Sequence, residues 1–211
     1  ALTELINASQ LDPQFDPAAE TLRSALNLAS LNDSASARFV LIGRGLGLVQ
    51  EWELAQAAFE SAIEADGGNA DAWAWLGEAK QQLAEDGSAE LDRAYELNSN
   101  SSTVRGLRGL HFQRIGNFRS ALTEFLAAAV LGQTNPAWQV SLGETYSKLG
   151  DLISAMQAYQ AATVLVPNDA AYWGMLAIFC GQNNVNIRDV GVPAAQQAVV
   201  LDPQNSASVE L

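Results

Sequence analysis

The chain has 211 residues, of which 48% are hydrophobic and 17% are charged. It contains 24 Asp and Glu but only 11 Lys and Arg. The net charge of −13 argues against nucleic acid or an anionic membrane surface as a partner, because both repel an acidic protein. A single cysteine, Cys180, excludes an internal disulfide and any zinc site built on several cysteines.

The N-terminal stretch, residues 1–35, is irregular, and we expect helices at about residues 2–10 and 17–30. The second of these is either part of a degenerate repeat or a cap over the exposed end of a repeat array. The chain has no run of 18 or more apolar residues and no secretory signal at its start, so membrane insertion of this segment is not expected. Because the sequence begins at Ala1 rather than Met, an upstream signal or anchor stays open. Localisation is therefore undetermined: cytoplasmic by default, extracytoplasmic if such a segment was removed.

From residue 36 onward, two landmarks recur at the spacing of one helical hairpin. Small residues, mostly after a large apolar one, stand at Gly43, Gly77, Gly109, Gly143 and Ala177, at intervals of 34, 32, 34 and 34 residues. A ladder of alanines follows at Ala62, Ala94, Ala128, Ala162 and Ala198, at intervals of 32, 34, 34 and 36. Between the landmarks, apolar residues fall three and four apart, which predicts helices. Each unit is therefore expected to be a helix, a turn and a second helix, with the small residues where neighbouring helices touch.

Short breaks separate the two helices of a unit, for example at Gly116-Asn117 and Gly150-Asp151. Asn135-Pro136 and Asn168-Asp169 each offer an N-cap at the start of the next unit. In the last unit the connection NNVNIRDVGVP is unusual, and Pro193 fits a late helix start there.

These residues resemble the tetratricopeptide repeat, W-x2-L-G-x2-Y…A-x3-F-x2-A…P. Residues 136–169 match best, with Leu142, Gly143, Tyr146, Gly150, Ala155, Tyr159, Ala162 and Pro167 in place. We expect five units, at residues 36–69, 70–101 (two residues short), 102–135, 136–169 and 170–205 (irregular), and the start of a truncated or capping helix at 206–211. The resemblance implies an all-α fold, a single right-handed α-solenoid whose first helices line a concave groove and whose second helices form the convex back.

The resemblance also implies that a partner polypeptide lies across the first helices. Their positions that point away from the stack define a predicted groove: Val40, Leu41, Arg44, Trp75, Glu78, Leu107, Leu110, Arg114, Val140, Glu144, Lys148, Met175 and Ile178. The row is largely apolar, and a contiguous apolar patch usually marks a contact surface. We expect a peptide or helix there with Trp75 as an anchor. The alternative is that Trp75 packs against neighbouring first helices or against residues 1–16.

Two further features concern charge. Four of the 11 basic residues fall in one unit and form a predicted basic patch, which would receive acidic side chains of a partner or of another copy, or be a solvated face: Arg105, Arg108, Arg114 and Arg119. A known subgroup of the family grips chaperone C-terminal carboxylates with Lys, Asn and Arg. The aligned positions here cannot supply those paired donors, so chaperone-tail binding is not expected: Val40, Arg44, Trp75, Thr103 and Leu107.

Catalytic, metal and cofactor sites are not expected. The only histidine, His111, lies in a first helix without a second residue to complete a catalytic set. Cys180 has an apolar helical context typical of a buried, unreactive thiol. The run Gly43–Gly47 sits within a helical stripe rather than after a strand, so close packing explains it better than phosphate binding.

The sequence therefore predicts a non-enzymatic protein-interaction scaffold that binds a peptide or helix in an apolar groove, for assembling or tethering a complex. Two alternatives stay open. One is a self-assembling homo-oligomeric structural protein. The other is the recruiting module of a larger enzyme or membrane protein.

Overall fold

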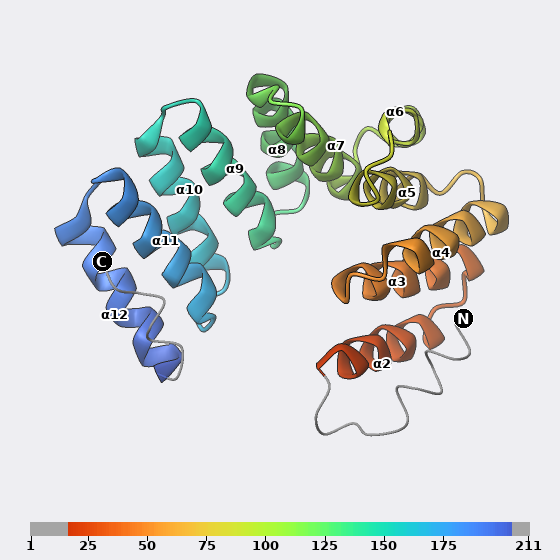
Figure 1. Cartoon of the computed structure of the whole chain (residues 1–211), viewed down its shortest axis with the longest axis horizontal. Coiled ribbons are helices and arrows are strands. Elements are labelled where there is room, and N and C mark those ends of the chain that lie inside the picture. The colour runs from red at the N-terminus through yellow and green to blue at the C-terminus, as the bar shows by residue number, and fades with distance from the viewer. Residues whose placement is uncertain (1–16, 204–211) are drawn as a thin grey trace. The chain divides into compact units, whose positions relative to one another are not determined.

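The computed structural model describes residues 17–203, which form helices and short connections without a β-strand among them. This confirms the predicted all-α fold (Figure 1). The helices are α2 (Pro17–Ser30), α3 (Ala35–Leu48), α4 (Trp52–Ala65), α5 (Ala70–Gln82), α6 (Ser88–Leu97), α7 (Ser102–Arg114), α8 (Phe118–Leu131), α9 (Pro136–Lys148), α10 (Leu152–Leu165), α11 (Ala170–Asn183), the π-helical turn η1 (Ile187–Gly191) and α12 (Val192–Leu201).

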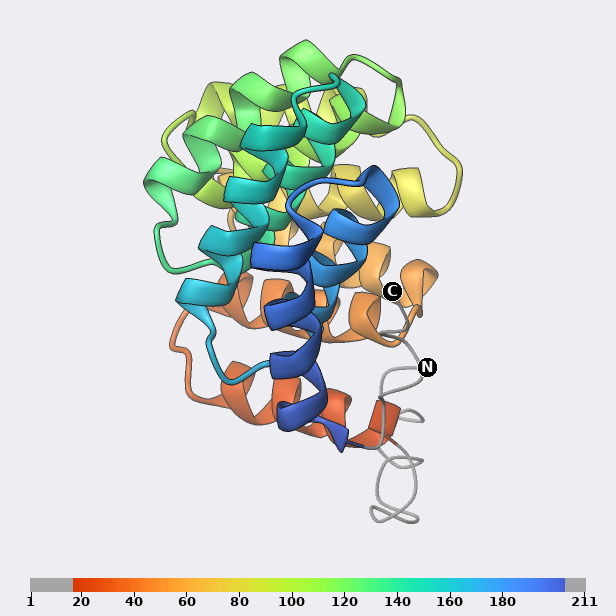
Figure 2. The ribbon, with the colours of Figure 1, turned by 90° about the vertical axis from the view of Figure 1, so that its left-hand side faces the viewer.

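The chain divides within α7, between His111 and Phe112, into two compact units. In the first unit α3 packs on α2 and α4, and α5 packs on α4 and α6. In the second unit α9 packs on α8, α10 on α9, α11 on α10 and α12 on α11. Figure 2 shows these helices, green to blue, side by side in chain order.

Small residues lie where the helices of a pair touch, as the sequence predicts. A Cβ atom added to Gly43 would lie 2.5 Å from the ring of Phe59, and one added to Gly143 would lie 2.7 Å from the ring of Tyr159. Such distances are too short for any side chain, so glycine is required for the second helix to approach. The alanine ladder is buried throughout, with at most 4% of any of its residues exposed: Ala62, Ala94, Ala128, Ala162 and Ala198.

The predicted helix boundaries coincide with local hydrogen bonds. The side chain of Asn135 accepts a hydrogen bond from the Ala137 amide, and that of Asp169 accepts one from the Ala171 amide, so both are N-caps. Gly116 and Gly150 have φ angles of +76° and +82°. This left-handed conformation, which favours glycine, ends the first helix and turns the chain into the second.

Two repeats depart from the common pattern. In the short repeat, α6 has only ten residues. A Cβ added to Gly87 would lie 2.1 Å from the Gly77 carbonyl oxygen, so the two backbones are in contact. In the last repeat, η1 leads directly into α12. Pro193 lies in the first turn of α12, where its missing amide hydrogen costs nothing, as expected.

The N-terminal segment contributes α2, which coincides with the helix expected at residues 17–30. Its Ala25 packs against Gly45 of α3, where an added Cβ would lie 2.4 Å from the Ala25 Cβ. The helix expected at 2–10 and the helix start expected at 206–211 lie outside the described residues.

Candidate functional site

A cavity of about 500 Å³ lies in the first unit between α2, α3 and α5. We call it the Trp75 cavity. Three members of the predicted groove, Leu41, Arg44 and Trp75, come together in its wall. Its lining residues are Glu20, Thr21, Ser24, Ala25, Leu28, Leu41, Arg44, Gly45, Leu48 and Trp75.

Trp75 is half-buried and held from two sides. Its ring stacks on Phe59 with a centroid separation of 6.1 Å and an interplanar angle of 19°. The Arg44 guanidinium lies 5.3 Å from the Trp75 ring centroid, close enough for a cation–π contact. Trp75 therefore packs on the neighbouring first helix α3, one of the two alternatives that the sequence left, and also on the second helix α4. The other alternative, packing on residues 1–16, lies outside the described residues. The same side chain still lines the cavity.

The rim of the Trp75 cavity is apolar and open to solvent. Leu28 of α2 is 58% exposed and Leu48 of α3 is 77% exposed. The sequence did not identify α2 as part of a site. Gly45 was the signal that could have identified it. This glycine lies two residues from Gly43 and so on a different side of α3, which indicates a second helix in close contact there. That helix is α2.

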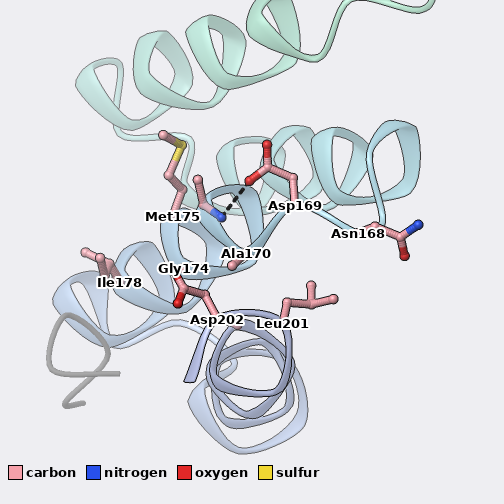
Figure 3. A pocket seen from close by; sticks show the side chains of 10 residues that line it. Asn168, Asp169, Ala170, Gly174, Met175, Ile178, Leu201 and Asp202 are labelled. Atoms are coloured by element: carbon pink, nitrogen blue, oxygen red, sulfur yellow. Dashed lines mark hydrogen bonds between the residues drawn. The ribbon is translucent and has the colours of Figure 1, made fainter. Parts of the chain in front are cut away.

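A second cavity, of about 550 Å³, lies in the second unit between α11 and the end of α12 (Figure 3). Met175 and Ile178, both predicted groove residues, line it from α11, and Leu201 and Asp202 line it from the end of α12. A Cβ added to Gly174 in its wall would have no heavy atom within 4 Å. The full lining is Asn168, Asp169, Ala170, Ala171, Gly174, Met175, Ile178, Ala198, Leu201 and Asp202.

Comparison with known proteins identifies the fold. The sequence matches no protein-family model and no curated protein. Among solved structures, PilF from Pseudomonas aeruginosa is 19% identical with a TM-score of 0.69, covering 83% of this chain and 80% of that one. The APC/C hetero-tetramer Cut9–Hcn1 is 16% identical with a TM-score of 0.71, covering 98% of this chain and 41% of that one. YrrB, a TPR protein with an unusual peptide-binding site, is 16% identical with a TM-score of 0.57, covering 88% of this chain and 95% of that one. This chain has the tetratricopeptide-repeat fold.

Within the tetratricopeptide repeats, three predicted groove residues are buried, so their assignment to an open groove is wrong. Val40, Glu78 and Leu107 are 8%, 4% and 1% exposed. Val40 packs with Ala62 and Ala72, between successive helix pairs. Leu107 packs on the α5–α6 pair, in the same cluster as Leu91 and Ala94. The Glu78 carboxylate accepts a hydrogen bond of 2.7 Å from the Gln82 amide, one turn along α5.

The remaining predicted groove residues lie on first helices in different environments. Leu110 and Val140 are half-buried against apolar clusters. Arg114, Glu144 and Lys148 are exposed in the second unit, where the Gln113 side chain donates a 3.2 Å hydrogen bond to Glu144.

Part of the predicted basic patch contacts the preceding repeat, residues 70–101. The guanidinium groups of Arg105 and Arg108 lie 4.6 and 4.0 Å from the ring centroid of Tyr95, a side chain of α6. These two cations are therefore held against an aromatic ring of the first unit. Arg114 and Arg119 belong to the second unit and are exposed.

The residues that the sequence offered as candidates for reactivity or phosphate binding are packed inside the fold. Cys180 is completely buried, as the sequence predicted, and burial raises the pKa of its thiol. The run Gly43–Gly47 lies inside α3, with each of its glycines against a neighbouring side chain, as close packing requires. Residues 17–203 contain no group of three or more His, Cys, Asp or Glu placed to hold a metal ion. Over the same range, every helix is too short or too polar to span a lipid bilayer.

Proposed function

We propose that this protein is an interaction scaffold that binds an apolar segment of a partner polypeptide in the Trp75 cavity, and so assembles or tethers a complex. One observation carries the proposal: exposed leucines surround a tryptophan that packs on Phe59 and Arg44, in an open cavity of an otherwise acidic unit. Tryptophan and arginine are the residue types that most often dominate binding energy at protein interfaces.

The size and chemistry of the cavity support a peptide ligand. About 500 Å³ lies in the range of sites that hold a small ligand, so it accommodates one or two anchoring side chains rather than a whole helix. Leu28, Leu41 and Leu48 supply apolar contacts, and the Arg44 guanidinium offers donors to a ligand carboxylate or carbonyl.

The similar structures support the same class of function. YrrB has a peptide-binding site, and Cut9 forms a hetero-tetramer with Hcn1. Among residues 17–203, the ionisable side chains that line the Trp75 cavity are Glu20 and Arg44, and no histidine or cysteine lies beside them. A binding role therefore accounts for the cavity better than catalysis.

The test is a selection of random 12-residue peptides, displayed on phage, against the full chain. Peptides recovered are synthesised and titrated by calorimetry against a double variant, Leu28→Asp with Leu48→Asp. Because both leucines are more than half exposed, these changes leave the fold intact. We expect the selected peptides to bind the double variant at least tenfold more weakly. The matched control is Leu31→Asp with Ala57→Asp, at exposed positions outside the cavity, and it should bind like the wild type.

Two further variants examine the anchor itself. Trp75→Ala should abolish binding, while Trp75→Phe, which keeps an aromatic ring on Phe59, should retain part of it. Thermal melting followed by circular dichroism confirms that each variant is folded. Selection of no peptide, or only of peptides that bind the Leu28→Asp/Leu48→Asp variant as tightly as the wild type, would contradict the proposal.

A further inference from the structure

The second helices of the two units differ at one repeated surface position. The residue two places after each alanine of the ladder is exposed in every repeat. In chain order it is Glu64, Glu96, Val130, Val164 and Val200. The three valines are 70%, 77% and 72% exposed. The first unit thus presents carboxylates where the second unit presents apolar side chains.

A second repeated position shows the same division. Two places before each ladder alanine stand Glu60, Asp92, Leu126, Gln160 and Gln196. Helices α10 and α12 contain no charged residue, and α8 contains only Arg119 and the buried Glu124. Residues 1–111 hold 17 of the 24 acidic side chains, and residues 112–211 hold seven.

These three helices, with Arg119 as their one exposed charge, all belong to the second unit. α8 and α10 flank a groove of about 470 Å³, with Leu126 and Val130 on one wall and Gln157 on the other. α10 and α12 both pack on α11 and contribute Met156 and Ala194 to one apolar cluster. We call this surface, made by the exposed side chains of α8, α10 and α12, the outer face.

We propose that the outer face binds the outer face of a second copy of this chain, a contact separate from the Trp75 cavity. A two-fold symmetric contact places the same patch of both copies together, so the patch must be complementary to itself. A surface that is largely apolar and carries a single charge, Arg119, meets this condition. The glutamates at the same positions of the first unit would repel one another.

The outer face is large enough for such a contact. Helices of 10 to 14 residues are about 15 to 21 Å long and, with their side chains, about 10 Å wide. The three helices together therefore present roughly 500 Å² in projection, and more as accessible area. A standard protein interface buries about 800 Å² on each partner, so the outer face fits a dimer of modest affinity.

The charge of the outer face argues against a lipid surface. Helices that lie on membranes carry Lys and Arg beside their apolar side, because anionic headgroups attract them. Here Arg119 is the single basic residue on the three helices, and the whole chain has a net charge of −13. Exposed valines at three equivalent positions, without flanking cations, favour an apolar protein surface.

Sedimentation velocity of the full chain over a concentration series tests this inference. We expect a monomer–dimer equilibrium whose dissociation constant rises at least 100-fold in the variant Val130→Glu, Val164→Glu, Val200→Glu. This variant places in the second unit the residue that the first unit has. The control is Thr134→Glu, Ala171→Glu, Gln182→Glu, which adds the same charge at exposed positions outside the second helices and should change the constant less than threefold.

A spin label provides a measurement that does not depend on weakening the contact. A nitroxide at Gln157→Cys should show dipolar broadening that increases with protein concentration. The same label at Ala57→Cys, the equivalent exposed position of α4, should not. A wild-type chain that stays monomeric at high concentration, or a glutamate variant that dimerises as well as the wild type, would overturn the inference. So would binding of the monomer to phosphatidylcholine–phosphatidylserine vesicles that the glutamate variant loses, because lipid would then be the occupant.

Discussion

The two units share their internal packing and differ in their surfaces. Gly43 meets Phe59 in the first unit and Gly143 meets Tyr159 in the second, at nearly the same distance. Two residues beyond the buried alanines Ala62 and Ala162, however, one unit exposes a glutamate and the other a valine. The repeat thus constrains the residues between helices and leaves the outer positions free to vary, so the differences between repeats are where function can be sought.

The largest effect should follow from filling the equivalent glycine in either unit. Gly43→Ala and Gly143→Ala each place a methyl group less than 3 Å from an aromatic ring, so the ring or the helix must move. We expect each to lower the free energy of unfolding by about 2 kcal/mol, measured by urea denaturation. A loss in one unit only would show that the two units are not packed alike.

The aromatic residue that packs on the glycine differs between the two units, and this makes their stability depend differently on high pH. Burial raises the pKa of Tyr159 to about 12, whereas its counterpart Phe59 does not ionise. An unfolded tyrosine ionises near pH 10, so between about pH 10 and 12 the unfolded state loses its proton first, and stability falls as pH rises. We expect this loss to reach roughly 2.7 kcal/mol at most.

Tyr159→Phe is the control for that prediction. It should remove this part of the loss of stability between pH 9 and 11.5 in urea denaturation. Because the pKa of Lys80 is also raised, through its hydrogen bond with Glu90, the first unit loses some stability in the alkaline range too. The difference between wild type and Tyr159→Phe isolates the contribution of the tyrosine. An unchanged pH profile in the variant would contradict a buried hydroxyl at this position.

The smallest expected change in the free energy of unfolding, and the only stabilising one, is at Gly174 in the wall of the second cavity. This glycine lies within α11 and has open space where a Cβ would stand. Gly174→Ala should therefore raise the free energy of unfolding by about 0.5–1 kcal/mol, because alanine loses less backbone entropy in a helix. A destabilising result would mean that another group occupies the cavity. The contrast with Gly143→Ala in the same unit controls for helix propensity.

The helices of this protein and the residues at which they begin could be predicted from the sequence alone. The intervals between the small residues and the alanines predicted helix pairs, and Asn135 and Asp169 predicted where helices begin, because caps and packing glycines act over a few residues. Leu41, Arg44 and Trp75 were predicted to face a partner, and they line the same cavity.

What the sequence determined by itself was the helical repeat, because the spacing of apolar and small residues follows directly from the geometry of one helix against the next. Only the tertiary structure decided which side chains stay exposed. Val40, Glu78 and Leu107 are covered although they lie on first helices, and α2 completes the Trp75 cavity. Exposure depends on the angle at which successive helix pairs pack, and that angle results from many side chains distant in sequence.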